Sequence, residues 1–410
     1  MMKIDEYQAK TLVNKSYATP FAWTEYTLNP YMGCWHDCMY CDGKAEKYHM
    51  HSDFAKTIKV KKNAAQLLEK FLNNKGYFIS KNATNHLFSN DPDFFRRKAA
   101  DFMLFFASGV CDPYQPVERN EKTTQQLLQV AYDYGIPVHL LTKNTLALRD
   151  IDLLKKINEQ NYAGVHFSIT LADDDLRKHF EPQTSSSQKR FDAVKQFRQL
   201  SIPSGIYFMP AMPFIGDTDE NMRAIYSNAK EANASFVMCM GLTLKPGKNK
   251  NEFFSVLENH FPDLVDKYRI LYGNNNPYGI LDVKQMARLK LMRAEMKSFR
   301  YAMEYQLPYY VPRYYLEGRI KSNLQMAEIL AIMSQLYDVF FNDYSISQSF
   351  RKAAHFFETF DKDIFSIQKE DIRLLPISRD IYPCLIDFYL NGKSTILKNL
   401  EKDAYNQALE

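Results

Sequence analysis

Short apolar runs alternate with helical patterns through most of this 410-residue chain. The runs lack the alternation of apolar and polar residues that a half-exposed strand shows, so we expect both faces of each strand to be covered. Strands and helices that repeat at this spacing favour parallel βαβ units, and about six units are predicted. The predicted strands cover 21–28, 102–107, 137–142, 164–170, 205–209 and 236–240, and the predicted helices cover 122–134, 146–160, 187–200 and 218–232.

The alternation ends near residue 275, and helical patterns follow it. We predict three parts: an N-terminal extension over 1–20, an α/β domain over 21–275 with an insertion at about 73–101, and a helical region over 276–410. Helical patterns in the last part cover 281–305, 323–341 and 347–360. We expect this region to form a helical cap across the carboxyl ends of the strands, where parallel α/β folds bind ligands.

A tyrosine-rich segment interrupts the helical region, and its tyrosines are Tyr309, Tyr310, Tyr314 and Tyr315. One hypothesis is that a tyrosine of this segment faces the site at the strand ends and helps to close a cavity there. The alternative is that the tyrosines pack the cap.

Charge and cysteine content favour an intracellular globular protein. The 52 basic and 48 acidic residues nearly balance, so charge alone does not indicate a nucleic-acid binder. No run of about 18 apolar residues predicts a membrane helix, and the first residues lack a signal-peptide core. Six cysteines in a chain of this length do not form a disulfide scaffold, so we expect a reducing, cytoplasmic location and no membrane partner.

Three cysteines, Cys34, Cys38 and Cys41, have the spacing C-x3-C-x2-C, and no fourth cysteine follows nearby. Thiolates are soft ligands for zinc or iron–sulfur clusters, and an ordinary cubane cluster takes four of them. Three thiolates on one short loop can hold three irons of a [4Fe-4S] cluster and leave the fourth iron open to a small molecule. The alternative is a zinc knuckle that takes His36 or His49 as its fourth ligand.

The longer string N-P-Y-M-G-C-W-H-D-C-M-Y-C, from Asn29 to Cys41, is similar to the form N-P-Y-x-G-C-x-H-x-C-x-Y-C of proteins related to spore photoproduct lyase. With Tyr40 before the last cysteine, the triad resembles the signature of radical S-adenosylmethionine (SAM) enzymes. The resemblance runs from about residue 21 to residue 273. It implies a partial (β/α)6 parallel barrel, a [4Fe-4S] cluster on the three cysteines, and SAM on the open iron.

The same resemblance implies a reaction. One electron from a flavodoxin- or ferredoxin-type donor would cleave SAM to methionine and a 5′-deoxyadenosyl radical, which abstracts hydrogen from a substrate. The protein would position the reactants and exclude water, while the cofactor supplies the chemistry.

Candidate cofactor-binding residues follow from the same resemblance. Lys143 and Ser168, at the ends of two predicted strands, match positions that hold the carboxylate of SAM. Arg190 belongs to a pattern similar to E-P-x7-R, in which it neutralises a carboxylate or pairs with Glu181. Tyr40 and Glu118 complete this set of candidates. From the residues alone, a surface lysine, a strand serine and a surface ion pair remain alternatives.

The segment after the second predicted strand is similar to S-G-x-x-D-P-Y-Q-P-x-E of related proteins. Asp112, Gln115 and Glu118 could hold an amine or hydroxyl there, although Asp-Pro can simply form a turn. Cys111 is a candidate catalytic residue that donates a hydrogen atom, although it is displaced from the position of the lyase's thiol. The alternative for Cys111 is a packed cysteine.

The substrate stays open, as does the choice between a lyase and an oxidoreductase. One alternative is a DNA photoproduct repair lyase, and DNA is a possible partner that the balanced charge does not favour. The second alternative is a zinc-stabilised nucleic-acid-binding module. The favoured interpretation is a radical SAM enzyme that acts on an unidentified substrate.

Overall fold

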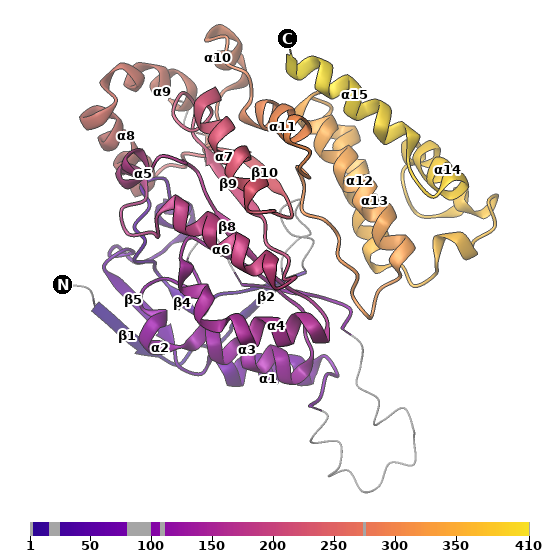
Figure 1. Ribbon diagram of the computed structural model, residues 1–410, viewed down its shortest axis with the longest axis horizontal. Coiled ribbons are helices and arrows are strands. Elements are labelled where there is room, and N and C mark those ends of the chain that lie inside the picture. The colour runs from indigo at the N-terminus through magenta and orange to yellow at the C-terminus, as the bar shows by residue number, and fades with distance from the viewer. Residues whose placement is uncertain (1–2, 16–24, 80–99, 107–110, 274–275, 410) are drawn as a thin grey trace, which may run out of the picture.

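The computed structural model describes residues 3–15, 25–79, 100–106, 111–273 and 276–409 (Figure 1). A seven-stranded sheet forms its centre, with the strand order β10-β9-β8-β7-β6-β3-β2. Its strands are β2 (Val13–Lys15), β3 (Tyr26–Leu28), β6 (Leu104–Phe106), β7 (Val138–Thr142), β8 (Ala163–Ser168), β9 (Ile206–Ala211) and β10 (Val237–Gly241). The strands from β3 to β10 pair in parallel, and only β2, at one edge, is antiparallel to its neighbour.

A smaller sheet lies beside the first strands of the large one. Its order is β1-β5-β4, with the strands β1 (Lys3–Tyr7), β4 (Tyr31–Met32) and β5 (Thr57–Lys61). Ile58 and Val60 of β5 are fully buried, so this short strand has one covered face. This sheet is not among the predicted elements, although β5 alternates polar and apolar residues as a half-exposed strand should.

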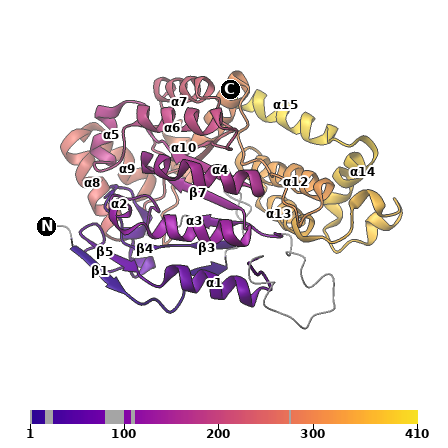
Figure 2. The same ribbon diagram turned by 60° about the horizontal axis from the view of Figure 1, so that its bottom comes forward.

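A row of helices covers one face of the large sheet (Figures 1 and 2). The row contains α1 (Ala64–Asn74), α3 (Thr123–Tyr134), α4 (Ile151–Gln160), α6 (Ser187–Gln199), α7 (Asp219–Glu231) and α11 (Ala294–Tyr305). Alternate side chains of the strands, such as Leu140 and Val165, are buried against these helices in the main hydrophobic core. Their neighbours in sequence, such as His139 and His166, lie on the opposite, inner face of the sheet, because successive strand residues alternate in direction.

The remaining helices complete the chain. They are α2 (Glu118–Glu121), α5 (Asp174–Phe180), α8 (Lys248–His260), α9 (Val265–Tyr272), α10 (Val283–Arg288), α12 (Lys321–Val339), α13 (Tyr344–Thr359), α14 (Tyr382–Asn391) and α15 (Thr395–Leu409). Helices α12, α13 and α14 share a separate hydrophobic cluster and lie on the right of Figure 1, away from β1 and β5.

The parallel α/β sheet and the helical C-terminal region are confirmed. Each predicted strand overlaps an observed strand of the large sheet, although residues 21–24 of the first one lie outside the described residues. Most of the predicted insertion at 73–101 lies outside them too. The single helix predicted over 281–305 is wrong. The chain forms α10 and α11 there, separated by a turn in which Lys290 has a left-handed φ of 50°.

The expected position of the helical cap needs correction. Helix α11 packs on β10 and α7, as a helix that follows a strand in a βαβ fold does. Its 12 residues span about 18 Å, so they return the chain from the carboxyl end of β10 to its amino end. Val237, the first residue of β10, donates its N–H to the carbonyl of Pro308 (2.8 Å). The tyrosine-rich segment therefore begins at the amino ends of the strands, not at their carboxyl ends.

The individual tyrosines agree with this correction. Tyr314 stacks on Tyr162, which directly precedes β8, with ring centroids 4.7 Å apart. The Tyr309 hydroxyl donates a hydrogen bond to Glu401 of α15 (2.9 Å). Tyr315 is exposed. These contacts pack the C-terminal helices against the amino end of the sheet, as the alternative interpretation held.

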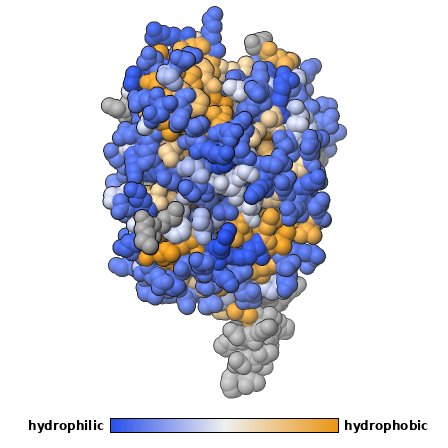
Figure 3. Space-filling view, turned by 60° about the vertical axis from the view of Figure 1, so that its left-hand side comes forward, coloured by the Kyte–Doolittle hydropathy of each residue, from blue (hydrophilic) through white to orange (hydrophobic). Residues whose placement is uncertain are grey.

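The face in Figure 3 is mostly hydrophilic, with separate hydrophobic patches. In the part of the chain that the structure describes, no helix has both the length and the apolar character needed to span a bilayer.

Gly164, on the inner face of β8, supports a stability prediction. A Cβ atom at this position would lie 2.2 Å from the Tyr162 hydroxyl oxygen and 2.5 Å from His166 Nε2. We expect Gly164→Ala to lower the free energy of unfolding by about 1–3 kcal/mol, because the overpacked side chains must move. Urea denaturation would measure the change. A second substitution, Tyr162→Leu, removes the clashing hydroxyl and should reduce the effect of the alanine. An alanine variant as stable as the parent would contradict this packing.

Candidate active site

The cysteine loop, residues 33–41, follows β4 and is held by hydrogen bonds from three other parts of the chain. The Cys34 N–H donates to the Phe54 carbonyl (3.1 Å), and the Met39 N–H donates to the Phe180 carbonyl (2.9 Å). Gln115 accepts the Trp35 N–H (3.0 Å) and donates its amide to the carbonyl of Gly33 (3.0 Å). The predicted ligand-binding candidate Gln115 thus braces the loop.

Gly33 is required in this loop for a physical reason. Its φ is +87°, in the left-handed region that glycine adopts without cost. A Cβ atom there would also lie 2.6 Å from the Phe54 carbonyl oxygen. The close approach of these two backbone segments therefore fixes the start of the cysteine loop.

The three thiols of the loop meet in a dry environment. Cys34 and Cys38 are buried, Cys41 is partly buried, and none forms a disulfide. Burial raises the pKa of all three thiols, and for Cys34 the charges of Asp112 and the other two cysteines raise the pKa further. The loop also closes on itself, because the Cys41 N–H donates to the Cys38 carbonyl (3.2 Å). A soft metal group that binds them would have to displace their protons.

This donor set fits an iron–sulfur cluster, because three soft sulfur ligands stand on one loop. Lys143 lies beside the same loop. Among the residues that the structure describes, no three His, Cys, Asp or Glu side chains are arranged to hold a single metal ion.

Lys143 and Ser168 lie side by side at the carboxyl ends of β7 and β8. The Lys143 ammonium donates a short hydrogen bond to the Ser168 hydroxyl, and it lies 5.7 Å from the centre of the Tyr40 ring. Asp112 fixes the end of β7, because its carboxylate accepts from the Thr142 hydroxyl (2.7 Å) and from the Lys143 N–H (2.8 Å). A cation and a hydroxyl therefore stand beside the cysteine loop, at the strand ends where the sequence predicted them.

Arg190 and Glu181 form a fully buried ion pair beneath this surface. Arg190 Nη2 donates to the Glu181 carboxylate (2.6 Å), and Nη1 donates to the Ser168 carbonyl (2.6 Å). The same carboxylate accepts hydrogen bonds from the hydroxyls of Tyr40 and Thr170. Of the two roles considered for Arg190, the structure shows the pairing with Glu181.

The groups around Glu181 lower the pKa of its carboxyl group. Burial alone would raise the pKa of its carboxyl group. The positive charges of Arg190 and Lys143 and the hydrogen bonds from Tyr40 and Thr170 outweigh burial and lower the pKa to about 2. The site therefore contains a fixed anion that connects the cysteine loop to β8.

Glu118 lies apart from the Lys143–Ser168 pair, at the start of α2. One carboxylate oxygen accepts from the Tyr31 hydroxyl and the Thr124 N–H (2.9 Å), and the other accepts from Arg149 (2.6 Å). These groups occupy both carboxylate oxygens, so Glu118 anchors β4 to the helices in this structure. Its predicted role in cofactor binding stays a prediction.

Cys111 is buried on the side of the small sheet. It packs in a cluster with Ile58, Val60 and Val117, and its thiol donates to the Asn29 side-chain oxygen (3.3 Å). Burial raises the pKa of this thiol to about 12. The surroundings are those of a packed, protonated cysteine, and hydrogen-atom donation by Cys111 stays a prediction.

Sequence reasoning missed the role of Thr170, because no motif in the neighbouring residues points to it. It considered His36 only as a zinc ligand. Thr170 follows β8 and contacts Glu181 across a loop. His36 lies within the cysteine loop and is buried. Its position between Cys34 and Cys38 was the signal that could have identified His36.

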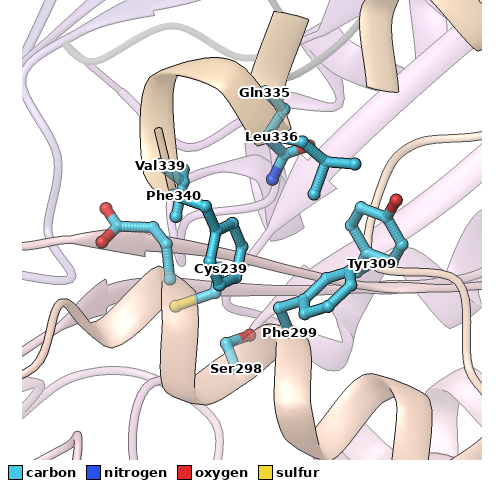
Figure 4. Close-up of a pocket in the computed structure, with 9 residues that line it drawn as sticks. Cys239, Ser298, Phe299, Tyr309, Gln335, Leu336, Val339 and Phe340 are labelled. Carbon is cyan, nitrogen blue, oxygen red and sulfur yellow. The ribbon is translucent and has the colours of Figure 1, made fainter. Parts of the chain in front are cut away.

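A small cavity lies elsewhere, between β10, α11 and α12 (Figure 4). Cys239, Phe299 and Tyr309 are among the residues that line it, together with residues of α12. No residue of the cysteine loop or of the Lys143–Ser168 pair lines this cavity. Tyr309 thus borders a space behind the sheet rather than the candidate active site.

Comparisons with known proteins identify a superfamily and several relatives. The family model of the radical SAM superfamily matches residues 28–229. An uncharacterized protein of Mycobacterium tuberculosis is 27% identical over 290 residues, which cover 69% of this chain and 77% of that protein. An uncharacterized protein of Methanocaldococcus jannaschii is 26% identical over 263 residues, which cover 64% of this chain and 85% of that protein.

A solved structure of spore photoproduct lyase, complexed with dinucleoside spore photoproduct, is also similar. The match has a TM-score of 0.47 and 15% identity, and covers 74% of this chain and 79% of the lyase.

The segment that the family model matches contains the cysteine loop, Lys143, Ser168 and Arg190. Residues 28–229 therefore belong to the radical SAM superfamily, which implies that this protein is an enzyme.

Proposed function

We propose that this protein holds a [4Fe-4S] cluster through Cys34, Cys38 and Cys41 and cleaves SAM to generate a radical that abstracts hydrogen from a substrate. The observation that carries the proposal is that three thiols of one loop, two of them buried and one partly buried, stand beside the Lys143–Ser168 pair at the carboxyl ends of parallel strands. When bound, the cluster supplies one electron that breaks a carbon–sulfur bond of SAM. A flavodoxin- or ferredoxin-type protein is the proposed electron source.

The residues around the thiols have separate tasks in this proposal. Lys143 and Ser168 hold the carboxylate of SAM, because an ammonium and a hydroxyl both donate hydrogen bonds to it. Their present bond to each other keeps both groups at the strand ends. Tyr40, Glu181 and Arg190 position the loop and β8, because one buried network links all three. We also propose that the parallel strands curve into the partial (β/α)6 barrel of the superfamily.

The substrate class rests on charge alone. The balanced charge of +4 continues to favour a substrate other than intact duplex DNA, because sequence-independent DNA binding needs many phosphate contacts. The tyrosine-rich segment gives no support for a closed cavity at the carboxyl ends of the strands, because it packs at their amino ends.

Anaerobic reconstitution tests the proposed function against the zinc alternative. The purified protein would be supplied with iron and sulfide, analysed for bound metal, and then incubated with SAM and a reductant. We expect about four irons and four sulfides per chain, together with release of 5′-deoxyadenosine. Stoichiometric zinc without SAM cleavage would support the zinc-stabilised binding module instead.

A substitution of Lys143 tests the assignment of the SAM carboxylate site. We expect Lys143→Ala to raise the dissociation constant for SAM about ten- to a hundredfold, because a hydrogen bond to a charged group contributes about 1.5–3 kcal/mol. Iron content should not change, since Lys143 is not a cluster ligand. Calorimetry under anaerobic conditions measures the affinity, and Lys155→Ala, at an exposed lysine of α4, is the matched control. Equal SAM affinity in the two variants would remove Lys143 from the site.

A further inference from the structure

His36 carries a buried imidazole inside the cysteine loop. Its relative exposure is 2%, and neither Nδ1 nor Nε2 has a partner in the described part of the chain. A buried polar group that makes no hydrogen bond costs about 1–3 kcal/mol, so such groups in native proteins nearly always bind something. An imidazole carries at least one N–H donor in every protonation state. The missing partner is therefore a hydrogen-bond acceptor.

Among the described residues, no group accepts a hydrogen bond from this donor. The carboxylate oxygen Oδ2 of Asp112 is 3.9 Å from His36 Nε2, which is too far for a hydrogen bond. Asp112 is also held in place by the Thr142 hydroxyl and by the backbone N–H groups of Tyr114 and Lys143. It cannot move toward His36 without losing these contacts.

The position of His36 limits what the acceptor can be. His36 stands between Cys34 and Cys38 in the loop, and its neighbours in space include Asp112 and Lys143. The group that fills the centre of this loop in the proposed function is the cluster with its bound SAM. Both carry anionic acceptors: the sulfides of the cluster and the carboxylate of SAM.

We propose that the His36 imidazole donates a hydrogen bond to an anionic acceptor of the cluster–SAM unit and is a cofactor-positioning residue rather than a metal ligand. This inference rests on the proposed function. A donor at this place stabilises the negative charge that it faces, and charge-assisted hydrogen bonds are about twice as strong as neutral ones. For a cluster sulfide, the hydrogen bond raises the reduction potential. For the SAM carboxylate, it increases the affinity for SAM.

The test uses variants that separate the donor from the volume of the side chain. His36→Leu removes the N–H groups, and His36→Gln keeps an amide N–H near the position of Nε2. His49→Gln is the matched control, because His49 is an exposed histidine of the same region. The whole protein, reconstituted anaerobically, is measured in three ways: iron and sulfide content, the midpoint potential of the SAM-free cluster by electron paramagnetic resonance, and the dissociation constant for SAM.

We expect His36→Leu to retain its iron and sulfide and to change one of the other two quantities. A tenfold or larger rise in the SAM dissociation constant at unchanged potential identifies the SAM carboxylate as the acceptor. A lower potential identifies a cluster sulfide. In either case His36→Gln should stay closer to the parent protein than His36→Leu does. If His36→Leu fails to fold, His36→Ala replaces it in the same comparison.

Three results would overturn the inference. The first is a His36→Leu protein whose potential and SAM affinity both match those of His49→Gln. The second is a His36→Gln protein that shows the full loss seen with leucine, because the loss would then not depend on the donor. The third is the loss of bound metal from every His36 variant, which would make His36 a ligand. Failure of the parent protein to assemble any iron–sulfur cluster is a separate outcome, and it rejects the proposed function itself.

Discussion

Replacing Cys34, Cys38 or Cys41 by alanine is expected to reduce both bound iron–sulfur cluster and 5′-deoxyadenosine formation to background. The three thiols are the proposed cluster ligands, and the other cysteines lie in separate packing environments among the described residues. A cluster left with two thiolates loses the ligand set that leaves one iron open for SAM. Iron and sulfide analysis, visible absorption and a SAM-cleavage assay would measure the loss.

The control for this prediction is Cys384→Ala. Cys384 is buried in the C-terminal helical cluster, where its thiol contacts Met333 (3.3 Å between the sulfur atoms). This variant removes the same chemical group from a site far from the loop in sequence, and it should keep its cluster. SAM cleavage that persists in any one of the three loop variants would remove the cluster assignment.

The second large effect concerns the ion pair of Arg190 with Glu181. We expect Arg190→Met to lower the free energy of unfolding by about 3–5 kcal/mol, because it leaves a buried carboxylate without its main counter-charge. It also removes the donors to the Ser168 and Ser185 carbonyls. Urea denaturation at pH 7 would measure the change. The double variant Arg190→Met/Glu181→Gln should recover part of it, because the charge that needed a partner is then gone.

An exposed arginine provides the matched control. Arg269 pairs with Glu258 and Asp266 on the surface, and its side chain is 60% exposed. Arg269→Met should cost no more than about 1 kcal/mol, because solvent screens such pairs. Equal losses for Arg190→Met and Arg269→Met would show that the buried pair does not stabilise the fold.

The pH dependence of the Arg190→Met effect has a defined sign. The pKa of Glu181 is lowered to about 2 in the folded protein from an ordinary value of 4.5. Its contribution to stability is therefore complete above pH 4.5 and is lost as the pH falls toward 2. Without Arg190, burial favours the protonated carboxyl group. The stability difference between parent and variant should thus shrink as the pH falls from 7 to 4.

The sequence predicted the central sheet well because its strands are mostly apolar and are buried on both faces. Runs such as Val138–Thr142 and Ala163–Ser168 have few alternatives to burial between two layers. The cysteine loop and the pair at the strand ends followed from motif resemblance and from the rule that parallel strands carry their functional groups at carboxyl ends.

The remaining features depend on contacts that sequence patterns do not encode. The sequence left Arg190 with two roles, and only the packing of α6 under β8 places its guanidinium against Glu181. The sequence left two positions open for the tyrosine-rich segment, and the choice depends on α11, which returns the chain to the amino ends of the strands. The break in the helical pattern over 281–305 depends on one left-handed residue. This residue is Lys290, whereas a glycine usually signals such a turn.

The hydrogen bonds that hold the cysteine loop have a consequence for how the protein acquires its cofactor. The hydrogen bonds from Cys34 to Phe54, from Met39 to Phe180 and through Gln115 are made entirely by the polypeptide. The fold of the chain alone therefore fixes the loop. In the proposed function, folding would precede delivery of the cluster, and loss of the cluster would leave the loop in place for reassembly.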